Sequence, residues 1–137
     1  MLPSLHDNYL TAYEVNCESR EITLHARCAE WAEEQLSRSI IFKGVEGYHF
    51  RDDAFGNIIS SLQETSVERL LSEYGSEIVE SFRRAGAPGS WAADMTFAPQ
   101  VLAASGVRGF VLSSSFGLSG WVLAKEALVS PASRSEK

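Results

Sequence analysis

Residues 21–28, Glu-Ile-Thr-Leu-His-Ala-Arg-Cys, alternate apolar and polar side chains more cleanly than any other stretch of the chain. Successive side chains of a β-strand point to opposite faces of the sheet, so this pattern predicts a strand with one buried face. The residues expected to face the core are Ile22, Leu24, Ala26 and Cys28. Residues 8–16 alternate in a similar way, and the two runs together predict an antiparallel hairpin.

The segments that follow extend the predicted sheet. Residues 39–43 and 45–50 contain the apolar and aromatic side chains that strands prefer, and residues 58–62 form a weaker strand pattern. Residues 52–57, Asp-Asp-Ala-Phe-Gly-Asn, have the composition of a turn. Residues 29–37 are predicted to be a charged connection.

Beyond residue 64 the hydrophobic period changes to that of a helix. Residues 65–68, Thr-Ser-Val-Glu, match a capping box in which Thr65 is the N-cap. Apolar residues then follow at helical spacing, and we expect them to be buried: Val67, Leu70, Leu71, Tyr74, Ile78 and Phe82. Gly86 and Pro88 predict the end of this helix, while Gly75 leaves open a break into two pieces.

The last part of the chain predicts a short helix and a closing hairpin. The helix covers residues 97–105, and strands are expected at residues 107–112 and 121–125. The small residues 113–120 are predicted to connect these two strands. The polar residues 130–137 are predicted to be a disordered tail.

Strands, then helices, then a closing hairpin predict an α+β fold, with a mainly antiparallel sheet and one long and one short helix. The 137 residues fit one domain, which we expect to comprise residues 1–129. No apolar run approaches the ~20 residues that span a bilayer, and the first residues do not form a secretory signal. We therefore expect a cytoplasmic protein in which Cys17 and Cys28 are free thiols.

The acidic residues are concentrated in the first half of the chain. The net charge is −6, and residues 1–68 carry 5 Lys/Arg against 12 Asp/Glu, a net charge of −7. Such a negative field repels phosphate backbones, so we expect no nucleic-acid partner. It favours a basic protein partner. The alternative is that the charge serves only solubility.

The residue types found in metal and acid–base sites occur at spacings that match no known signature. His6-Asp7 and His49 with Asp52 and Asp53 contain suitable ligands, but the spacing is not that of a zinc site. Adjacent carboxylates on an extended chain point in opposite directions, so Asp52 and Asp53 are read as turn residues. We predict no metal, no cofactor and no catalytic residue.

Two other segments are candidates for binding. Residues 113–120 contain four serines and two glycines, which suit either an anion cradle or a tight hairpin. Trp31 lies among the carboxylates of Glu30, Glu33 and Glu34, a composition typical of an interface with a basic partner. We predict these four residues as the binding site. The alternative is that Trp31 folds back onto the sheet.

The opening Leu5-His6-Asp7-Asn8, the hairpin and residues 40–45, Ile-Ile-Phe-Lys-Gly-Val, together cover about a third of the chain. In this third the chain resembles small bacterial proteins that begin with a Leu-His-Asp element. Some of these belong to immunity-protein families of polymorphic toxin systems. The resemblance implies a non-enzymatic cytoplasmic α+β domain that binds a toxin, and it brings no catalytic residues. Asn8 departs from the small residue expected at its position.

Three classes of function therefore remain. The first is a non-enzymatic protein-binding domain, in its specific form an immunity protein that neutralises a basic toxin. The second is a small enzyme or ligand-binding domain that uses His6, His49, Asp52 or the Ser113–Gly120 segment. The third is a subunit of a structural homo-oligomer joined through sheet edges. A deep pocket with converging polar groups would support the second class.

Overall fold

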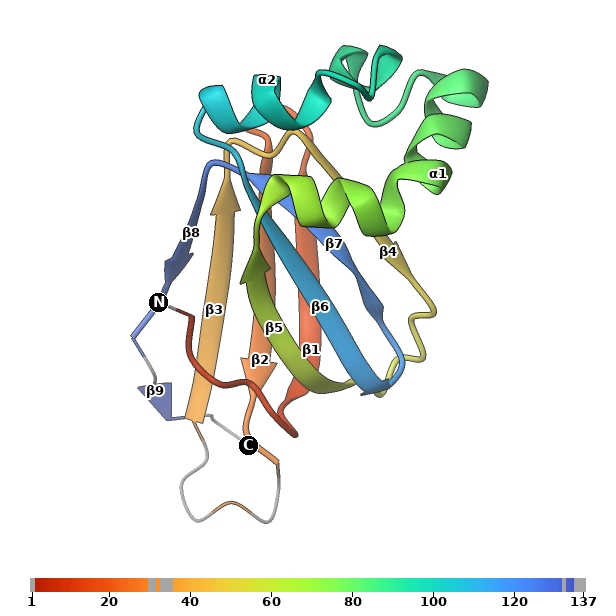
Figure 1. Cartoon of the computed structure of the whole chain (residues 1–137). Helices are drawn as coiled ribbons and strands as arrows, with labels where there is room; N and C mark the ends of the chain where they lie inside the picture. The colour runs from red at the N-terminus through yellow and green to blue at the C-terminus, as the bar shows by residue number, and fades with distance from the viewer. Residues whose placement is uncertain (1, 30–31, 33–35, 132, 135–137) are drawn as a thin grey trace.

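The computed structural model describes residues 2–29, 32, 36–131 and 133–134 (Figure 1). Its elements confirm the predicted α+β class, with an antiparallel sheet and one long and one short helix. They are, in chain order, β1 (Tyr9–Asn16), β2 (Glu21–Arg27), β3 (Leu36–Lys43), β4 (Gly47–Arg51), β5 (Ile58–Thr65), α1 (Val67–Ala85), the 3₁₀ turn η1 (Ser90–Ala93), α2 (Ala98–Ala104), β6 (Arg108–Phe116), β7 (Ser119–Ala124), β8 (Glu126–Val129) and β9 (Ser133–Arg134).

The antiparallel sheet bends so that its two end strands, β4 and β8, converge at one corner without pairing with each other over their described residues. Its strand order is β4-β7-β6-β5-β1-β2-β3-β8, with β9 beside β3. The two ends of this path converge because β3 leads into β4 while β7 leads into β8. The pairs Lys43↔Glu126 and Gly47↔Leu123 lie on either side of this junction. At the opposite corner β1 joins β5 through a single strand pair, Tyr9↔Ile58.

The two halves of the sheet face each other around the main core (Figure 1). β1, β2 and β3 form one half, and β5, β6 and β7 form the other. The three apolar positions of the alternating pattern, Ile22, Leu24 and Ala26, are buried in this core as predicted, together with Phe42 and Phe110. Cys28 was predicted to join them, but it follows the end of β2 and is only half-buried.

The helices cover the outer side of the second half of the sheet, so β6 and β7 are packed on both faces. The predicted stripe of α1 is confirmed. Its members Val67, Leu70, Leu71 and Ile78 are buried, and Tyr74 and Phe82 pack partly buried against the same cluster. α1 is continuous through Gly75 and ends at Gly86, which adopts the left-handed conformation (φ 71°) that glycine favours.

The predicted N-cap of α1 is wrong by one residue. Ser66 is the N-cap, and its hydroxyl oxygen accepts a hydrogen bond from Arg69 N at 3.1 Å. Thr65 is instead the last residue of β5, where it pairs with Gly109 of β6. A strand pair formed across the sheet therefore competes successfully with a local cap at this position.

Two further segments differ from the sequence prediction. Residues 113–116 continue β6 and residues 119–120 begin β7, so only residues 117–118 of the predicted connection are a turn. Within the predicted tail, Ser130 donates from its backbone N to Ser39 O at 2.9 Å, and Ser133 and Arg134 pair with β3. The physical reason is that β8 pairs with β3, so the residues that follow β8 lie beside β3 as well. None of the described helices is long and apolar enough to cross a lipid bilayer.

Candidate functional site: a groove between α1 and β4

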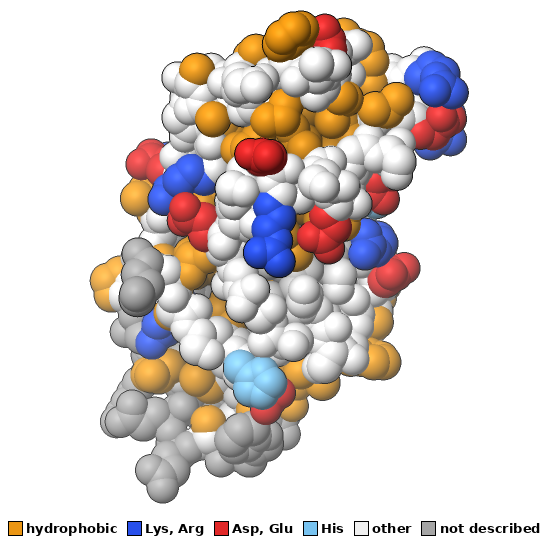
Figure 2. Space-filling model, in the orientation of Figure 1, with side chains coloured by type: hydrophobic (Ala, Val, Ile, Leu, Met, Phe, Trp, Pro, Cys, Tyr) orange, Lys and Arg blue, Asp and Glu red, His pale blue; other side chains and the backbone are white. Residues whose placement is uncertain are grey.

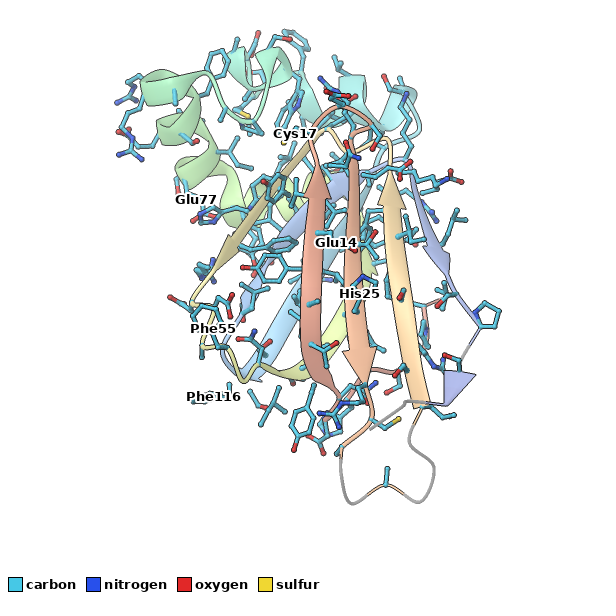
Figure 3. The ribbon with its side chains drawn as sticks, turned by 180° about the vertical axis from the view of Figure 1, so that it is seen from behind. Glu14, Cys17, His25, Phe55, Glu77 and Phe116 are labelled. Atoms are coloured by element: carbon cyan, nitrogen blue, oxygen red, sulfur yellow. The ribbon has the colours of Figure 1, made fainter. Side chains whose placement is uncertain are left out.

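A groove of about 620 Å³ lies between three elements of the described structure. One side is the end of the β1–β2 hairpin, with Val15 and Cys17. The opposite side is the second half of α1, with Glu77 and Arg84. β4 runs along the base of the groove. Figure 3 shows Cys17 at the hairpin end and Glu77 on α1, on the same side of the molecule.

The edge of β4 faces this groove because β2, which pairs with the preceding strand β3, does not extend alongside β4. β2 pairs with β3 as far as Lys43, and the hairpin then turns away. Beyond Lys43, the hairpin is joined to the segment after β3 by a backbone hydrogen bond in which Val45 N donates to Arg20 O at 3.1 Å. Residues 45–49 all line the groove. Because alternate residues of a strand point to opposite faces, five consecutive lining residues mean that the backbone edge faces the groove.

The floor of the groove is apolar and firmly packed. Trp121 and Ile78 are buried there, and Trp121 Nε1 donates a hydrogen bond to Glu77 Oε1 at 3.3 Å. Gly47 allows the chain after α1 to approach β4, because a Cβ at this position would lie 2.7 Å from Pro88 Cβ. Tyr48 pairs with Val122, so it lies on the opposite face of β4 from Trp121 and offers a 41% exposed aromatic surface on the hairpin side of the groove.

Carboxylates outnumber cations along the walls. The charged residues that line the groove are Glu21, Glu46, Glu77, Glu80, Arg20 and Arg84. Arg20 Nη1 lies 3.4 Å from Glu46 Oε2, and Arg84 Nε lies 4.0 Å from Glu80 Oε1. Glu21 Oε2 lies 3.9 Å from Nζ of Lys43, which is outside the groove lining, so Glu77 is the lining carboxylate whose described contacts include no cation. An apolar floor with an acidic wall suits a ligand that combines apolar groups with a positive charge.

A second polar cluster lies on the outer face of β1, β2 and β3 (Figure 3). His25 Nδ1 is 2.8 Å from Ser39 Oγ, and His25 Nε2 is 2.8 Å from Glu14 Oε2. This order of groups resembles an acid, a base and a nucleophile. However, Glu14 is 70% exposed and His25 is 37% exposed, so both groups are open to solvent. We interpret the cluster as cross-strand hydrogen bonding that stabilises the sheet.

The predicted binding residues Glu30, Trp31, Glu33 and Glu34 lie outside the described residues. They belong to the connection between β2 and β3. Their role therefore stays a prediction.

The residues suggested for an enzyme are in separate places. His6 Nδ1 contacts Ser60 O at 3.1 Å, whereas His49 lines the groove on β4. Asp52 follows β4, and its carboxylate lies 3.8 Å from Arg51 Nε. Within the part of the chain that the structure describes, no three His, Cys, Asp or Glu residues are grouped so as to hold a metal ion.

The hydroxyl groups of the serine-rich segment are used within the hairpin. Ser114 Oγ donates to Leu118 O, and Ser115 Oγ donates to Ile58 O at 3.3 Å. Ser119 Oγ accepts a hydrogen bond from Ser114 N at 3.2 Å. These contacts favour the tight-hairpin interpretation over an anion cradle.

Exposed aromatic residues also occur away from the groove. Phe55 is 97% exposed in the loop after β4, and Figure 3 shows it at the same end of the molecule as Phe116. At the opposite end, hydrophobic side chains gather over α2 (Figure 2), where Phe97 is largely exposed. Neither surface is hollowed like the groove or lined by its combination of apolar and acidic groups.

The loop after β4 is held by Asp53. Its carboxylate accepts hydrogen bonds from Asn57 Nδ2 at 2.9 Å, from Phe55 N at 2.9 Å and from Tyr13 Oη at 2.8 Å. These bonds favour the ionised form and hold the pKa of Asp53 below its ordinary value, with Asn57 contributing most.

This lowered pKa predicts a stability that depends on pH. The contribution of Asp53 is present above the unfolded-state pKa of about 3.9 and is lost as the pH falls through the lower folded-state pKa. The difference in unfolding free energy between the wild type and Asp53→Asn should therefore shrink on acidification. Urea titrations from about pH 6 down to about pH 2.5 measure it. Asp52→Asn is the control, and a wild-type advantage over Asp53→Asn that stays constant across this range would contradict the assignment.

Comparisons of the chain with protein-family models, with curated proteins and with solved structures found no match. The site is therefore interpreted from its own geometry and charge.

Proposed function

We propose that this chain is a binding domain without chemistry of its own, and that a segment of a basic protein partner occupies the groove between α1, the β1–β2 hairpin and β4. The observation that carries the proposal is the groove itself, which has a buried apolar floor at Ile78 and Trp121 and an excess of carboxylates on its walls. Its volume of about 620 Å³ lies within the usual range of binding pockets.

The composition of the groove supports a protein partner. Protein interfaces commonly centre on aromatic anchors in desolvated pockets and have charged groups at the rim. Tyr48 is suited to be such an anchor, because it is aromatic, partly exposed and lines the groove. Glu77 is suited to attract a cation, because its described contacts include a neutral indole N–H and no cation.

The charge of the whole chain supports a basic partner as well. Residues 1–68 carry a net charge of −7, and opposite charge speeds the encounter of two proteins. The resemblance of the first third of the chain to immunity proteins suggests that this partner is a toxin. In that form of the proposal, the domain neutralises the toxin by covering part of its surface.

Capture from an extract of the native host, compared between groove variants, tests the proposal. Tyr48→Ala should weaken binding of the captured partner by more than about 2 kcal/mol, because it removes an anchor. Glu77→Gln should mainly slow association and reduce its dependence on salt, because the glutamine can still accept from Trp121 but has no charge. Binding rates at several salt concentrations give both quantities.

Two matched variants control for general effects. Phe97→Ala removes an exposed aromatic side chain from α2, and Glu73→Gln removes an exposed carboxylate from α1 outside the groove. Both should bind like the wild type. If Tyr48→Ala also binds normally, the groove is not the site. If Trp31→Ala alone abolishes binding, the connection between β2 and β3 is the site instead.

A further inference from the structure

The exposed edge of β4 indicates how the partner segment binds. We propose that the segment adds to the sheet as a further β-strand along β4, with alternating apolar and Lys or Arg side chains. This inference rests on the proposed function, since it specifies the form of the ligand in the same groove. Strand addition requires an unpaired strand edge, space next to that edge, and surrounding side chains that select the sequence of the added strand.

β4 provides the unpaired edge. It stands at one end of the strand path, and among the described residues its only strand partner is β7. Every second residue of such a strand directs its N–H and C=O away from the sheet, where they can pair with another chain. The five residues of β4 extend over about 17 Å, which accommodates a typical short strand.

The sequence of β4 lacks the residues that usually protect an edge strand. Natural edge strands often carry lysine, proline or a covering loop, which prevents pairing with other chains. The sequence of β4, Gly-Tyr-His-Phe-Arg, contains neither lysine nor proline, and its only cation is the final Arg51. Tyr48 is exposed on this strand, and Phe50 stacks against it with ring centroids 5.5 Å apart. The open side of β4 is therefore suited to pairing.

The groove supplies room beside this edge. α1 forms the opposite wall, and a cleft between an edge strand and a helix is a geometry in which extended peptides add to a sheet. Main-chain hydrogen bonds then provide affinity, and pockets for alternate side chains provide specificity.

The two walls define the sequence that the added strand should have. Side chains directed to the hairpin wall meet Val15 and Tyr48, which lies on the opposite face of β4 from Trp121, and should be apolar. Side chains directed to α1 meet Glu77, whose carboxylate accepts a hydrogen bond from Trp121, and should be Lys or Arg. Because strand side chains alternate in direction, the two kinds should alternate along the peptide.

Selection from a phage library of random peptides of about eight residues tests this inference on the full chain. The enriched peptides should alternate apolar residues with Lys or Arg. N-methylation of single backbone amides in a synthetic enriched peptide should weaken binding at least about tenfold at alternate positions, because it removes hydrogen bonds to β4. Tyr48→Ala should reduce affinity similarly, whereas Phe97→Ala should not.

Each other outcome contradicts a defined part of the account. If enriched peptides compete for the groove but tolerate N-methylation at every position, strand addition is wrong while the groove remains the binding site. If the enriched peptides carry apolar residues at helical spacing, the ligand is a helix and the inference fails. If the wild type enriches no peptide beyond those captured by Tyr48→Ala, strand addition is wrong. In that case capture of the host partner decides the proposed function separately.

Discussion

Replacing Leu70 with alanine should lower the free energy of unfolding by about 2–5 kcal/mol. Leu70 is 0% exposed and lies on the face of α1 that packs against the sheet. A Cβ built on Gly109 of β6 would lie 3.0 Å from Leu70 Cδ1, so the side chain fills the space directly above that strand. Alanine would leave a cavity there, because the surrounding backbone is fixed by strand pairing on both sides of β6.

Chemical denaturation of Leu70→Ala and Val79→Ala measures this effect against a matched control. Val79 lies on the same helix but is 37% exposed, so its truncation should cost less than about 1 kcal/mol. A loss below about 1 kcal/mol for Leu70→Ala would mean that the phase assigned to α1 is wrong.

Replacing Asn57 with alanine should destabilise the protein by about 2–3 kcal/mol. Asn57 is a buried polar residue, 4% exposed. Its Oδ1 accepts hydrogen bonds from Ala54 N at 3.0 Å and from Leu118 N at 2.8 Å, while its Nδ2 donates to Asp53. The side chain thus joins the loop after β4 to the turn between β6 and β7. Without it, Leu118 N would remain buried without this partner.

Asn16→Ala is the control for this prediction. Asn16 Oδ1 also accepts from two backbone N–H groups, those of Glu18 and Ser19, at 3.1 and 3.0 Å. These groups are exposed, so water can replace the lost partner and the cost should stay below about 1 kcal/mol. Equal losses for Asn16→Ala and Asn57→Ala in urea denaturation would show that burial of the amide has little importance.

The elements with strong local periodicity could be predicted from the sequence. The alternation from Glu21 to Arg27 and the helical spacing from Val67 to Phe82 each depend on neighbouring residues, and both are found in the structure. Thr65 was assigned wrongly because the competing interaction is not local. Its pairing with Gly109 joins residues that are far apart in the chain.

The groove could not be predicted for the same reason. It exists because β4 pairs with β7 while β3 pairs with β2 and β8, and because the β1–β2 hairpin ends before β4 begins. The hydrophobic pattern within one strand does not indicate which other strand it pairs with. His49 was noted as a chemical candidate but was grouped with Asp52 by spacing, whereas its position on β4 places it in the groove. Tyr48 and Glu77 fall within the predicted strand 45–50 and the predicted long helix, where the sequence pattern alone indicated no role in binding.

The polar cluster of Glu14, His25 and Ser39 was not predicted. The alternation of residues 21–28 implies only that His25, between Leu24 and Ala26, lies on the solvent side of its strand. Its contact with Ser39 depends on the register of β2 against β3, in which His25 pairs with Ser39. A signal was available in the sequence, since polar residues at the outward positions of neighbouring strands can meet across a sheet. The register was needed to select the pair.

The reactivity of Cys17 tests the central claim most directly. Cys17 is an exposed free thiol that lines the groove, whereas Cys28 is half-buried, does not line it and follows β2. Alkylation of the two thiols can be followed in one sample by mass spectrometry, with and without the captured partner. If the partner occupies the groove, alkylation of Cys17 should slow at least about tenfold while that of Cys28 stays unchanged. Protection of Cys28 alone, or of neither thiol, in a saturated complex would contradict the account.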